Sequence, residues 1–153
     1  MKTENIDDID ISIINIIKNN SKTTYAEIGK QINVSAGTVH IRIKKLEEMG
    51  IILGYRTEID YKKLNYDITA FLGIYLQKSS SYEMVAVQLK KIPEVVDIHY
   101  TTGLYSMFIR IICKDTEHLR SVLMDKIQTI EEITRTETFI SLHESYSRAL
   151  KIE

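Results

Sequence analysis

The sequence lacks the features of secreted and membrane-embedded proteins. Its single cysteine, Cys113, cannot form a disulfide within the chain. The N-terminus, MKTENIDDID, carries acids where a secretory signal peptide needs bases followed by an apolar block. The longest strongly apolar run, 71–76, is far shorter than the roughly 20 residues of a membrane-spanning helix. We therefore expect a cytoplasmic protein with no transmembrane segment and no membrane partner.

A global excess of positive charge is also missing, because the 153 residues carry a formal net charge of −1. Overall charge therefore gives no support for a nucleic-acid partner. The local distribution differs, since the stretch from Ile28 to Leu46 has no acid and four bases, Lys30, Arg42, Lys44 and Lys45. Positive charge focused on one element is typical of a nucleic-acid contact surface.

Three helices are predicted within the first 50 residues. Isoleucines at helical spacing predict a first helix over 8–18. Thr24 and Glu27 form a capping-box pattern that opens a second helix, which reaches residue 32. After a turn, Ser35 is placed to cap a third helix. The buried stripe of this third helix is expected to comprise Ala36, Val39, Ile43 and Leu46.

The outer side of the third helix carries small and polar groups early and bases late, which suits a recognition helix in the major groove. A basic helix face taken alone is more often a solvated surface. Gly37 and Ile41 lie on the outward side of this helix, and we expect Ser35, Thr38 and His40 near base edges. The residues expected at phosphates are Lys30, Arg42, Lys44 and Lys45.

A β-hairpin wing is predicted after the third helix. Gly50 is placed as a C-terminal cap, and residues 51–60, IILGYRTEID, alternate apolar and polar residues around Gly54. A capped helix pair with a wing is much more specific than a basic helix. The first domain is therefore expected to be a winged helix-turn-helix over residues 1–60.

A second domain over 68–153 is expected after a charged linker at 61–67. Strands are predicted at 68–78, 94–102, 104–113 and 133–143. Helices are predicted at 81–92, with Met84, Val87 (or Gln88) and Leu89 near the apolar face, and at 115–130. The order β-α-β-β-α-β is that of a ferredoxin-like fold, with both helices on one face of an antiparallel sheet. The whole chain is therefore expected to be of the α+β class.

Both halves resemble the Lrp/AsnC, or feast/famine, family of transcription regulators. The resemblance lies in TYAEIGKQI and VSAGTVHIRIKKLEEMGII, preceded by IDDIDISIINII, and it covers nearly the whole chain. The matching features are the Asp-rich opening of the first helix, the Gly50-Ile51-Ile52 exit, Tyr55, and the pattern of Val39, Arg42, Ile43 and Leu46. The resemblance implies a sequence-specific DNA-binding regulator with an amino-acid-binding (RAM-type) second domain.

Gly103, in TTGLYS, can adopt positive φ and expose backbone donors to a small carboxylate. A glycine between two strands is, by itself, more often a simple hairpin residue. The resemblance implies effector binding by Tyr100, Thr101, Gly103, Leu104, Tyr105 and Ser106, and also by Gln128, Thr136 and Thr138.

The identity of the expected effector also rests on resemblance. Many relatives place an aspartate where this chain has Ser106, and a neutral hydroxyl weakens the case for an ion pair with the effector ammonium. The segments YTTGLYSMF, KIQTI and TETFI look most like the asparagine-responsive branch of the family. Asparagine is therefore the expected ligand.

Dimerisation is expected because one small recognition helix gives limited affinity, whereas two helices related by a two-fold axis read two half-sites of double-stranded DNA. The family resemblance further implies dimers joined into an octamer. A homo-oligomer that binds both DNA and an amino acid is the expected assembly.

Two other classes of protein remain as alternatives, namely an amino-acid-sensing subunit that docks on an enzyme, and an enzyme with an unidentified reaction. The basic stretch without acids argues against the first. The four histidines have no HExxH or CxxC partner, and Cys113 lies in an apolar strand as a packing residue. We therefore expect neither an enzyme nor a metal or other cofactor.

Overall fold

The computed structural model describes residues 6–152, and these form two compact units. The helical unit reaches Glu58 and also includes the segment that starts at Tyr146, whereas the sheet unit spans Ile59–Ser145. The C-terminal segment therefore differs from the expected division, which assigned it to the second domain. It contacts the first helix, because Lys18 Nζ donates to the Leu150 carbonyl at 2.7 Å and Asn15 Nδ2 donates to the Ile152 carbonyl at 2.9 Å.

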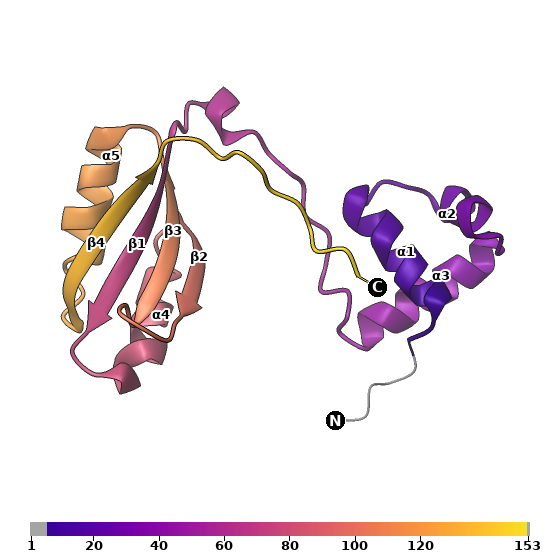
Figure 1. Cartoon of the computed structure of the whole chain (residues 1–153), viewed down its shortest axis with the longest axis horizontal. Helices are drawn as coiled ribbons and strands as arrows, with labels where there is room; N and C mark the ends of the chain where they lie inside the picture. The colour runs from indigo at the N-terminus through magenta and orange to yellow at the C-terminus, as the bar shows by residue number, and fades with distance from the viewer. Residues whose placement is uncertain (1–5, 153) are drawn as a thin grey trace. The chain divides into compact units, whose positions relative to one another are not determined.

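The helical unit contains α1 (Asp8–Asn19), α2 (Tyr25–Ile32) and α3 (Ala36–Glu48), as predicted (Figure 1). The predicted capping box of α2 is present, since the Thr24 amide donates to Glu27 at 2.8 Å and the Glu27 amide donates to Thr24 Oγ1 at 3.3 Å. Such reciprocal bonds satisfy amides that the first turn leaves without helical partners. The starts of these helices are therefore set by local sequence.

One apolar core holds the three helices together, and its buried members are Ile13, Ile17, Ile28, Val39 and Ile43. The expected stripe of α3 is correct for Val39, Ile43 and Leu46 but wrong for Ala36, which is exposed at the first turn. The turn between α2 and α3 is tight, because a Cβ on Gly29 would lie 2.5 Å from the Val34 carbonyl oxygen. This turn fixes the angle at which α3 leaves α2.

The predicted hairpin wing is wrong in the part of the chain that the structure describes. Gly50 adopts the expected left-handed conformation, with φ 69°, but residues 53–60 form no strand. Leu53 is 92% exposed, and a two-stranded hairpin without a packed face is marginal in water. One contact ties the segment to α3, because the Tyr55 hydroxyl donates to Glu47 at 2.9 Å.

The sheet unit has the predicted β-α-β-β-α-β order. Its strands are β1 (Ile68–Leu76), β2 (Val95–Tyr100), β3 (Met107–Cys113) and β4 (Ile133–Ser141), and all neighbours in the order β2-β3-β1-β4 are antiparallel. Its helices are α4 (Tyr82–Leu89) and α5 (Thr116–Ser121). Short 3-10 turns lie at η1 (Tyr61–Leu64) and η2 (Ser79–Ser81), and α5 continues as a π-helical segment, η3 (Val122–Ile127). This is the expected ferredoxin-like arrangement.

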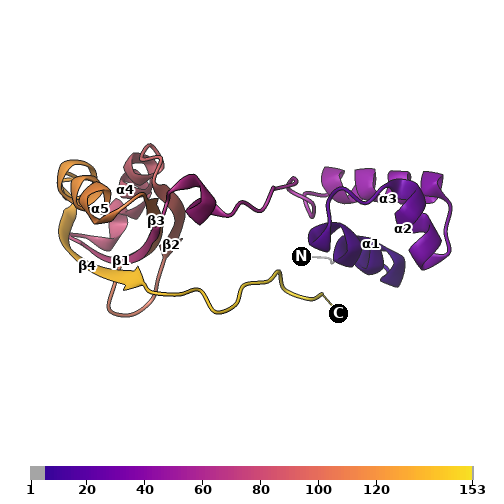
Figure 2. The same ribbon diagram turned by 90° about the horizontal axis from the view of Figure 1, so that it is seen from above.

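Both helices cover one face of the sheet (Figure 2). Ala70, Leu72 and Ile74 of β1 are fully buried beneath them. Cys113 is also fully buried, in agreement with its expected packing role. The expected apolar face of α4 is partly wrong: Leu89 is buried, but Met84 and Val87 are 51% and 55% exposed, while Val85 and Ala86 face the core.

The opposite face of the sheet carries an aromatic cluster made of Phe71, Tyr105, Phe108 and Phe139. The Phe71 and Phe108 rings are stacked with centroids 6.0 Å apart, and Tyr105 lies 6.2 Å from Phe139. A Cβ on Gly73 would lie 2.4 Å from the Tyr105 ring, so glycine is what lets this ring lie on β1. The cluster is only partly buried in the chain by itself.

None of the helices within residues 6–152 is long and apolar enough to cross a membrane.

Candidate DNA-binding and effector sites

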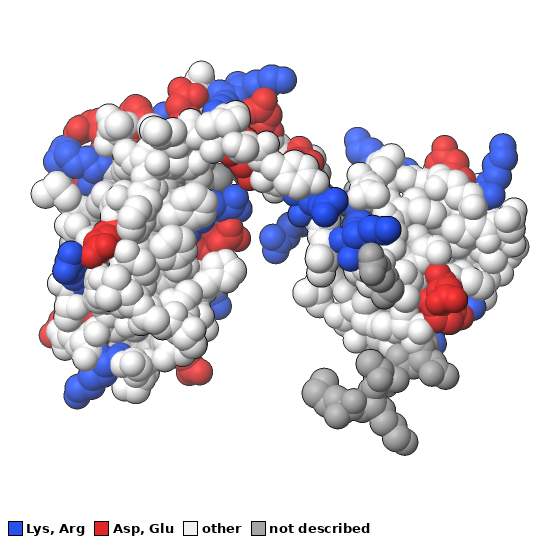
Figure 3. Space-filling model, in the orientation of Figure 1, with Lys and Arg blue, Asp and Glu red and all other residues white. Residues whose placement is uncertain are grey.

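The predicted DNA-contact residues lie on the outer surface of α3 and the end of α2. Ile41 is 70% exposed, although it is apolar. The other exposed members of the predicted set are Lys30, Ser35, Gly37, His40, Lys44 and Lys45. Lys44 Nζ lies 3.8 Å from Glu48, but both side chains are more than two-thirds exposed, so water screens this pair. In Figure 3, Lys and Arg side chains project from the helical unit at several places.

Ser35 and Thr38 act together at the start of α3. The Thr38 amide donates to Ser35 Oγ at 3.0 Å, and the two hydroxyl oxygens lie 2.8 Å apart. Ser35 is therefore the helix cap, as predicted. The same two side chains that we expect near base edges thus also fix the first turn of α3.

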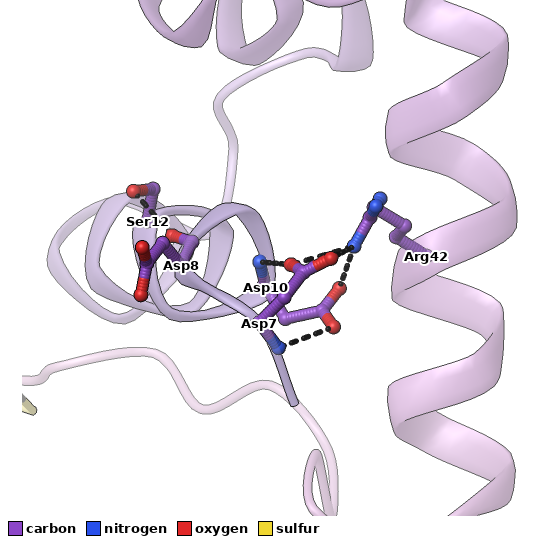
Figure 4. A network of polar contacts seen from close by, with 5 residues as sticks. All are labelled: Asp7, Asp8, Asp10, Ser12 and Arg42. Atoms are coloured by element: carbon purple, nitrogen blue, oxygen red, sulfur yellow. Dashed lines mark hydrogen bonds and ion pairs between the residues drawn. The ribbon is translucent and has the colours of Figure 1, made fainter. Parts of the chain in front are cut away.

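Arg42 is placed differently from the expectation of a phosphate contact. Its Nη1 donates to both carboxylate oxygens of Asp7 at 2.7 Å and to Asp10 Oδ1 at 2.9 Å (Figure 4). Asp10 is the one buried charged residue among those described, at 2% exposure, and the Arg42 side chain is 26% exposed. This ion-pair network joins the start of α1 to the middle of α3.

The network changes the electrostatics of both partners. The hydrogen bond from Arg42 is the main cause that holds the pKa of Asp7 below its usual value. The same bond with Asp7, and then that with Asp10, raises the pKa of Arg42. Each side therefore stabilises the charged form of the other.

Three residues that the sequence did not single out contribute to this surface. Asp7 and Asp10 hold Arg42, and the Tyr25 ring stacks on the His40 ring with centroids 5.2 Å apart and planes inclined by 20°. The signal for the aspartates was their i, i+3 spacing, because each side chain accepts a hydrogen bond from the backbone amide of the other in a second capping box. A shallow depression of about 650 Å³ between the network and α3 is lined by Ile6, Asp7, Asp10, Thr38, Ile41, Arg42 and Lys45.

The predicted effector loop connects β2 and β3 and is held by its own backbone. The Thr101 amide donates to the Ser106 carbonyl at 3.2 Å, and Thr101 Oγ1 donates to the Tyr105 carbonyl at 2.8 Å. Gly103 has a φ of 112°, so it occupies a backbone conformation that favours glycine. At the tip Leu104 is 72% exposed, and Tyr100 at the start of the loop is 53% exposed.

The other predicted effector residues lie at the same end of β1 as this loop. Gln128 Nε2 donates to Thr136 Oγ1 at 3.2 Å. Thr136 is the register partner of Ile74, whose carbonyl accepts a hydrogen bond from the Ser106 amide at 2.9 Å. Thr138 follows Thr136 by two residues, so both point to the same side of β4. Both predicted groups thus lie near Ile74 of β1, Thr136 on the helix-covered side of the sheet and Tyr105 on the aromatic side.

Glu137, which the sequence did not single out, is the polar centre of the aromatic cluster. It accepts hydrogen bonds from the hydroxyls of Tyr105 and Tyr75, at 2.8 Å and 3.1 Å, and pairs with Arg135 at 2.7 Å. The bond from Tyr105 is the main cause that lowers the pKa of Glu137, and the same bond raises the pKa of Tyr105. The sequence could have indicated Glu137 through its position between Thr136 and Thr138, which were both predicted as effector residues.

Within residues 6–152 no three His, Cys, Asp or Glu side chains converge as a metal site would require. The cysteine thiol is also unsuited to nucleophilic chemistry, because burial raises the pKa of Cys113 to about 11. The polar groups that the fold gathers instead suit non-covalent binding.

Comparison with known proteins agrees with the two domain types. A family model described as winged helix-turn-helix DNA-binding matches residues 6–52, and one described as the Lrp/AsnC ligand binding domain matches residues 69–150. Regulatory protein AsnC of Escherichia coli K12 is 42% identical over 146 residues, which cover 95% of this chain and 96% of the relative. The same-named protein of Haemophilus influenzae is 42% identical over 147 residues, covering 96% and 98%.

A solved structure of E. coli AsnC superposes with a TM-score of 0.90 at 40% identity and covers 97% of this chain and 100% of that one. Sequence, fold and both domain matches thus agree over nearly the whole length. The protein is therefore a transcription regulator rather than an enzyme, modulated by an amino acid, and it belongs to the Lrp/AsnC family.

Proposed function

We propose that this regulator senses asparagine in the cytoplasm and reads its operator as a homo-oligomer through α3. The observation that carries the proposal is the loop 100–106 joined through β1 to Gln128 and Thr136. The similarity to regulatory proteins named AsnC supports asparagine as the ligand.

At the DNA, Lys30, Lys44 and Lys45 neutralise phosphates, while Ser35, Thr38 and His40 meet base edges. The exposure of the three lysines supports the first role, since each ammonium group can reach the DNA backbone. Ile41 is the apolar residue of the same surface, and Gly37 leaves space on it because it has no side chain. Arg42 acts mainly by holding α3 against α1, because its Nη1 is already bonded to two carboxylates.

At the effector site, the backbone of Gly103 and Leu104 and the hydroxyls of Thr101 and Ser106 meet the amino acid main chain. Tyr100 and Tyr105 flank it, and the Gln128 amide with Thr136 and Thr138 meets its side chain. An amide on the protein suits an amide on the ligand, because each offers a donor and an acceptor. This complementarity supports asparagine over a leucine-like ligand, whose side chain offers no group that can hydrogen-bond to the Gln128 amide.

The aromatic face of the sheet supports dimerisation. Phe139 is 46% exposed, and a depression of about 290 Å³ on this face is lined by Phe71, Asp97, His99, Phe108, Ile109 and Arg110. Aromatic side chains at an uncovered face are typical of interfaces between subunits. We expect dimers through this face, and assembly of dimers into an octamer as the family resemblance implies.

The direct test of the ligand is calorimetry on ligand-free protein with asparagine, and with aspartate, glutamine and leucine as competitors. We expect asparagine to bind most tightly and Gln128→Ala to weaken asparagine about tenfold or more, since it leaves the ligand amide unpaired. The exposed Gln31 on α2 provides the matched control, because Gln31→Ala keeps the effector site intact. Binding of another amino acid in place of asparagine would refute the ligand assignment.

Sedimentation tests the assembly. We expect Phe139→Glu to reduce the mass of the assembly at micromolar concentration, because it puts a charge into the proposed interface. Met124→Glu is the control, since Met124 is a similarly exposed apolar residue, at 53% against 46% for Phe139, on the helical side of the unit. A wild-type monomer that binds operator with full affinity would contradict the proposed assembly.

DNA binding tests the coupling between the DNA-binding and effector sites. Affinity is measured for a specific operator and for random DNA, at two salt concentrations, with and without asparagine. We expect affinity to fall steeply with salt, because phosphate contacts release counterions. Asparagine is expected to shift specific binding. Specific binding indifferent to every amino acid tested would refute the effector role.

A further inference from the structure

His40 does not project freely from α3, because an aromatic ring from another helix lies against it. The Tyr25 ring is parallel to the imidazole within 20°, with centroids 5.2 Å apart. Tyr25 is the first residue of α2, directly after the Thr24 cap. The stack therefore links the start of α2 to the middle of the recognition helix.

The backbone on the Tyr25 side of this stack is fixed. Thr24 and Glu27 make both bonds of the capping box, and the Ile28 amide donates to the Thr24 carbonyl at 2.9 Å. Tyr25 thus starts a helix whose first turn is held by a complete capping box. Its ring is attached to a rigid part of the fold, although 43% of the side chain remains exposed.

On the α3 side, the helix leaves open space beside the imidazole. Helical side chains lean toward the N-terminus of their helix, so His40 extends over the preceding turn, where Gly37 lies at i−3. Gly37 has no side chain, and a Cβ there would approach nothing closer than Ser35 Oγ, at 3.7 Å. No side chain at position 37 limits the imidazole, and the stack with Tyr25 is a contact that can set its direction.

We propose that Tyr25 is a positioning residue for sequence reading, which acts by holding the His40 ring edge toward the bases. The inference rests on the proposed role of His40 at a base edge. A hydrogen bond to a base requires one ring orientation, and ordering a free side chain on binding reduces affinity by about twofold to tenfold. A ring that is already oriented avoids this loss only on the DNA sequence that His40 recognises.

A simple packing role for Tyr25 makes a different prediction. Loss of packing destabilises the helical unit and weakens binding to all DNA sequences alike. Loss of orientation instead weakens specific binding, removes preference at the one base pair that His40 contacts, and leaves binding to random DNA unchanged. Base preference therefore separates the two roles.

The experiment uses the full-length protein and an operator selected by it from random DNA, with every base pair of one half-site then substituted. Affinities are measured for wild type, Tyr25→Phe, Tyr25→Leu, His40→Ala and the double variant Tyr25→Leu/His40→Ala. Tyr25→Phe keeps the aromatic face, whereas Tyr25→Leu keeps apolar bulk without it. Thermal unfolding of each variant checks that the helical unit is intact.

We expect Tyr25→Phe to bind as the wild type does. Tyr25→Leu should lose twofold to tenfold in affinity for the operator but not for random DNA, and its base preference should relax at the same base pair as in His40→Ala. The double variant should be no weaker than His40→Ala, because Tyr25 acts through His40. The inference is overturned if His40→Ala relaxes preference but Tyr25→Leu does not, or if the two losses add. A His40→Ala variant with unchanged preference at every base pair would instead refute the proposed role of His40 itself.

Discussion

Removal of the Asp10 carboxylate tests whether the ion-pair network fixes α3 against α1. Asp10 is almost fully buried and makes two bonds, one from Arg42 Nη1 at 2.9 Å and one from the Asp7 amide at 3.2 Å. A hydrogen bond between charged groups contributes about 1.5 to 3 kcal/mol, and a capping bond contributes about 1 kcal/mol. Arg42 keeps Asp7 and is partly solvated, so we expect Asp10→Ala to cost about 2 to 3 kcal/mol.

Hydrogen exchange on the full-length protein measures this loss in the helical unit separately from the sheet unit. A loss of about 2 to 3 kcal/mol corresponds to a drop of about 30- to 150-fold in the protection of core amides in α1 and α3. Amides of β1 and β3 should be unaffected, because Asp10 belongs to the other compact unit. The site of the change is thus part of the prediction.

Asp8→Ala is the matched control. Asp8 lies in the same first turn but its side chain is exposed, and the bond shown at Asp8 in Figure 4 runs from Ser12 to the backbone carbonyl. Only its interaction with the helix dipole is lost, which is about 0.3 to 1 kcal/mol, or less than about sixfold in protection. Equal effects of the two substitutions on α3 would refute the structural role assigned to the network.

Three further predictions follow from other contacts. Burial favours the neutral form of Glu94, but the hydrogen bonds from Lys126 and His118 outweigh it and keep the pKa of Glu94 below its usual value. We therefore expect this carboxylate to stabilise the sheet unit above pH about 4.5, and this stability to be lost as the pH falls through the lowered pKa. The free energy of unfolding of Glu94→Gln should change less with pH in acid than that of the wild type. Because burial raises the pKa of Cys113 to about 11, the thiol should resist alkylation at pH 8 in the native protein and react after unfolding; fast native labelling would contradict its placement. Gly73→Ala should cost about 1 to 3 kcal/mol of sheet-unit stability, because a Cβ would lie 2.4 Å from the Tyr105 ring, and Tyr105→Leu in the same chain should recover much of the loss measured by urea unfolding.

The starts of α1, α2 and α3 could be predicted from the sequence, and so could the order of strands and helices. A capping box needs only two side chains three residues apart, so Thr24 and Glu27 are sufficient to place the start of α2. The strands that became β1 and β3 were likewise predicted, at 68–78 and 104–113. The winged helix-turn-helix and ferredoxin-like classes follow from these local rules.

Contacts between distant residues were decided only by the tertiary structure. Arg42 looked like a phosphate ligand, but Asp7 and Asp10, 35 and 32 residues away, approach it once α1 packs on α3. The sequence also could not predict which face of α4 is exposed, because apolar residues occur all round this short helix. Packing on the sheet is what buries Val85, Ala86 and Leu89. The missing hairpin at 53–60 has the same cause, since an alternating pattern becomes a strand only where a partner pairs with it.

The sequence by itself therefore determined the two fold classes, the caps of α2 and α3 and the family, because these depend on neighbours along the chain. The tertiary structure alone decided which charged and aromatic side chains are free to meet DNA or ligand. Tyr25 shows the difference, because nothing in the spacing of residues 25 and 40 indicates a stack. The tight turn after α2, which packs closely on Gly29, is what brings α2 and α3 together. Side-chain partners across that turn depend on the angle between helices, which packing sets.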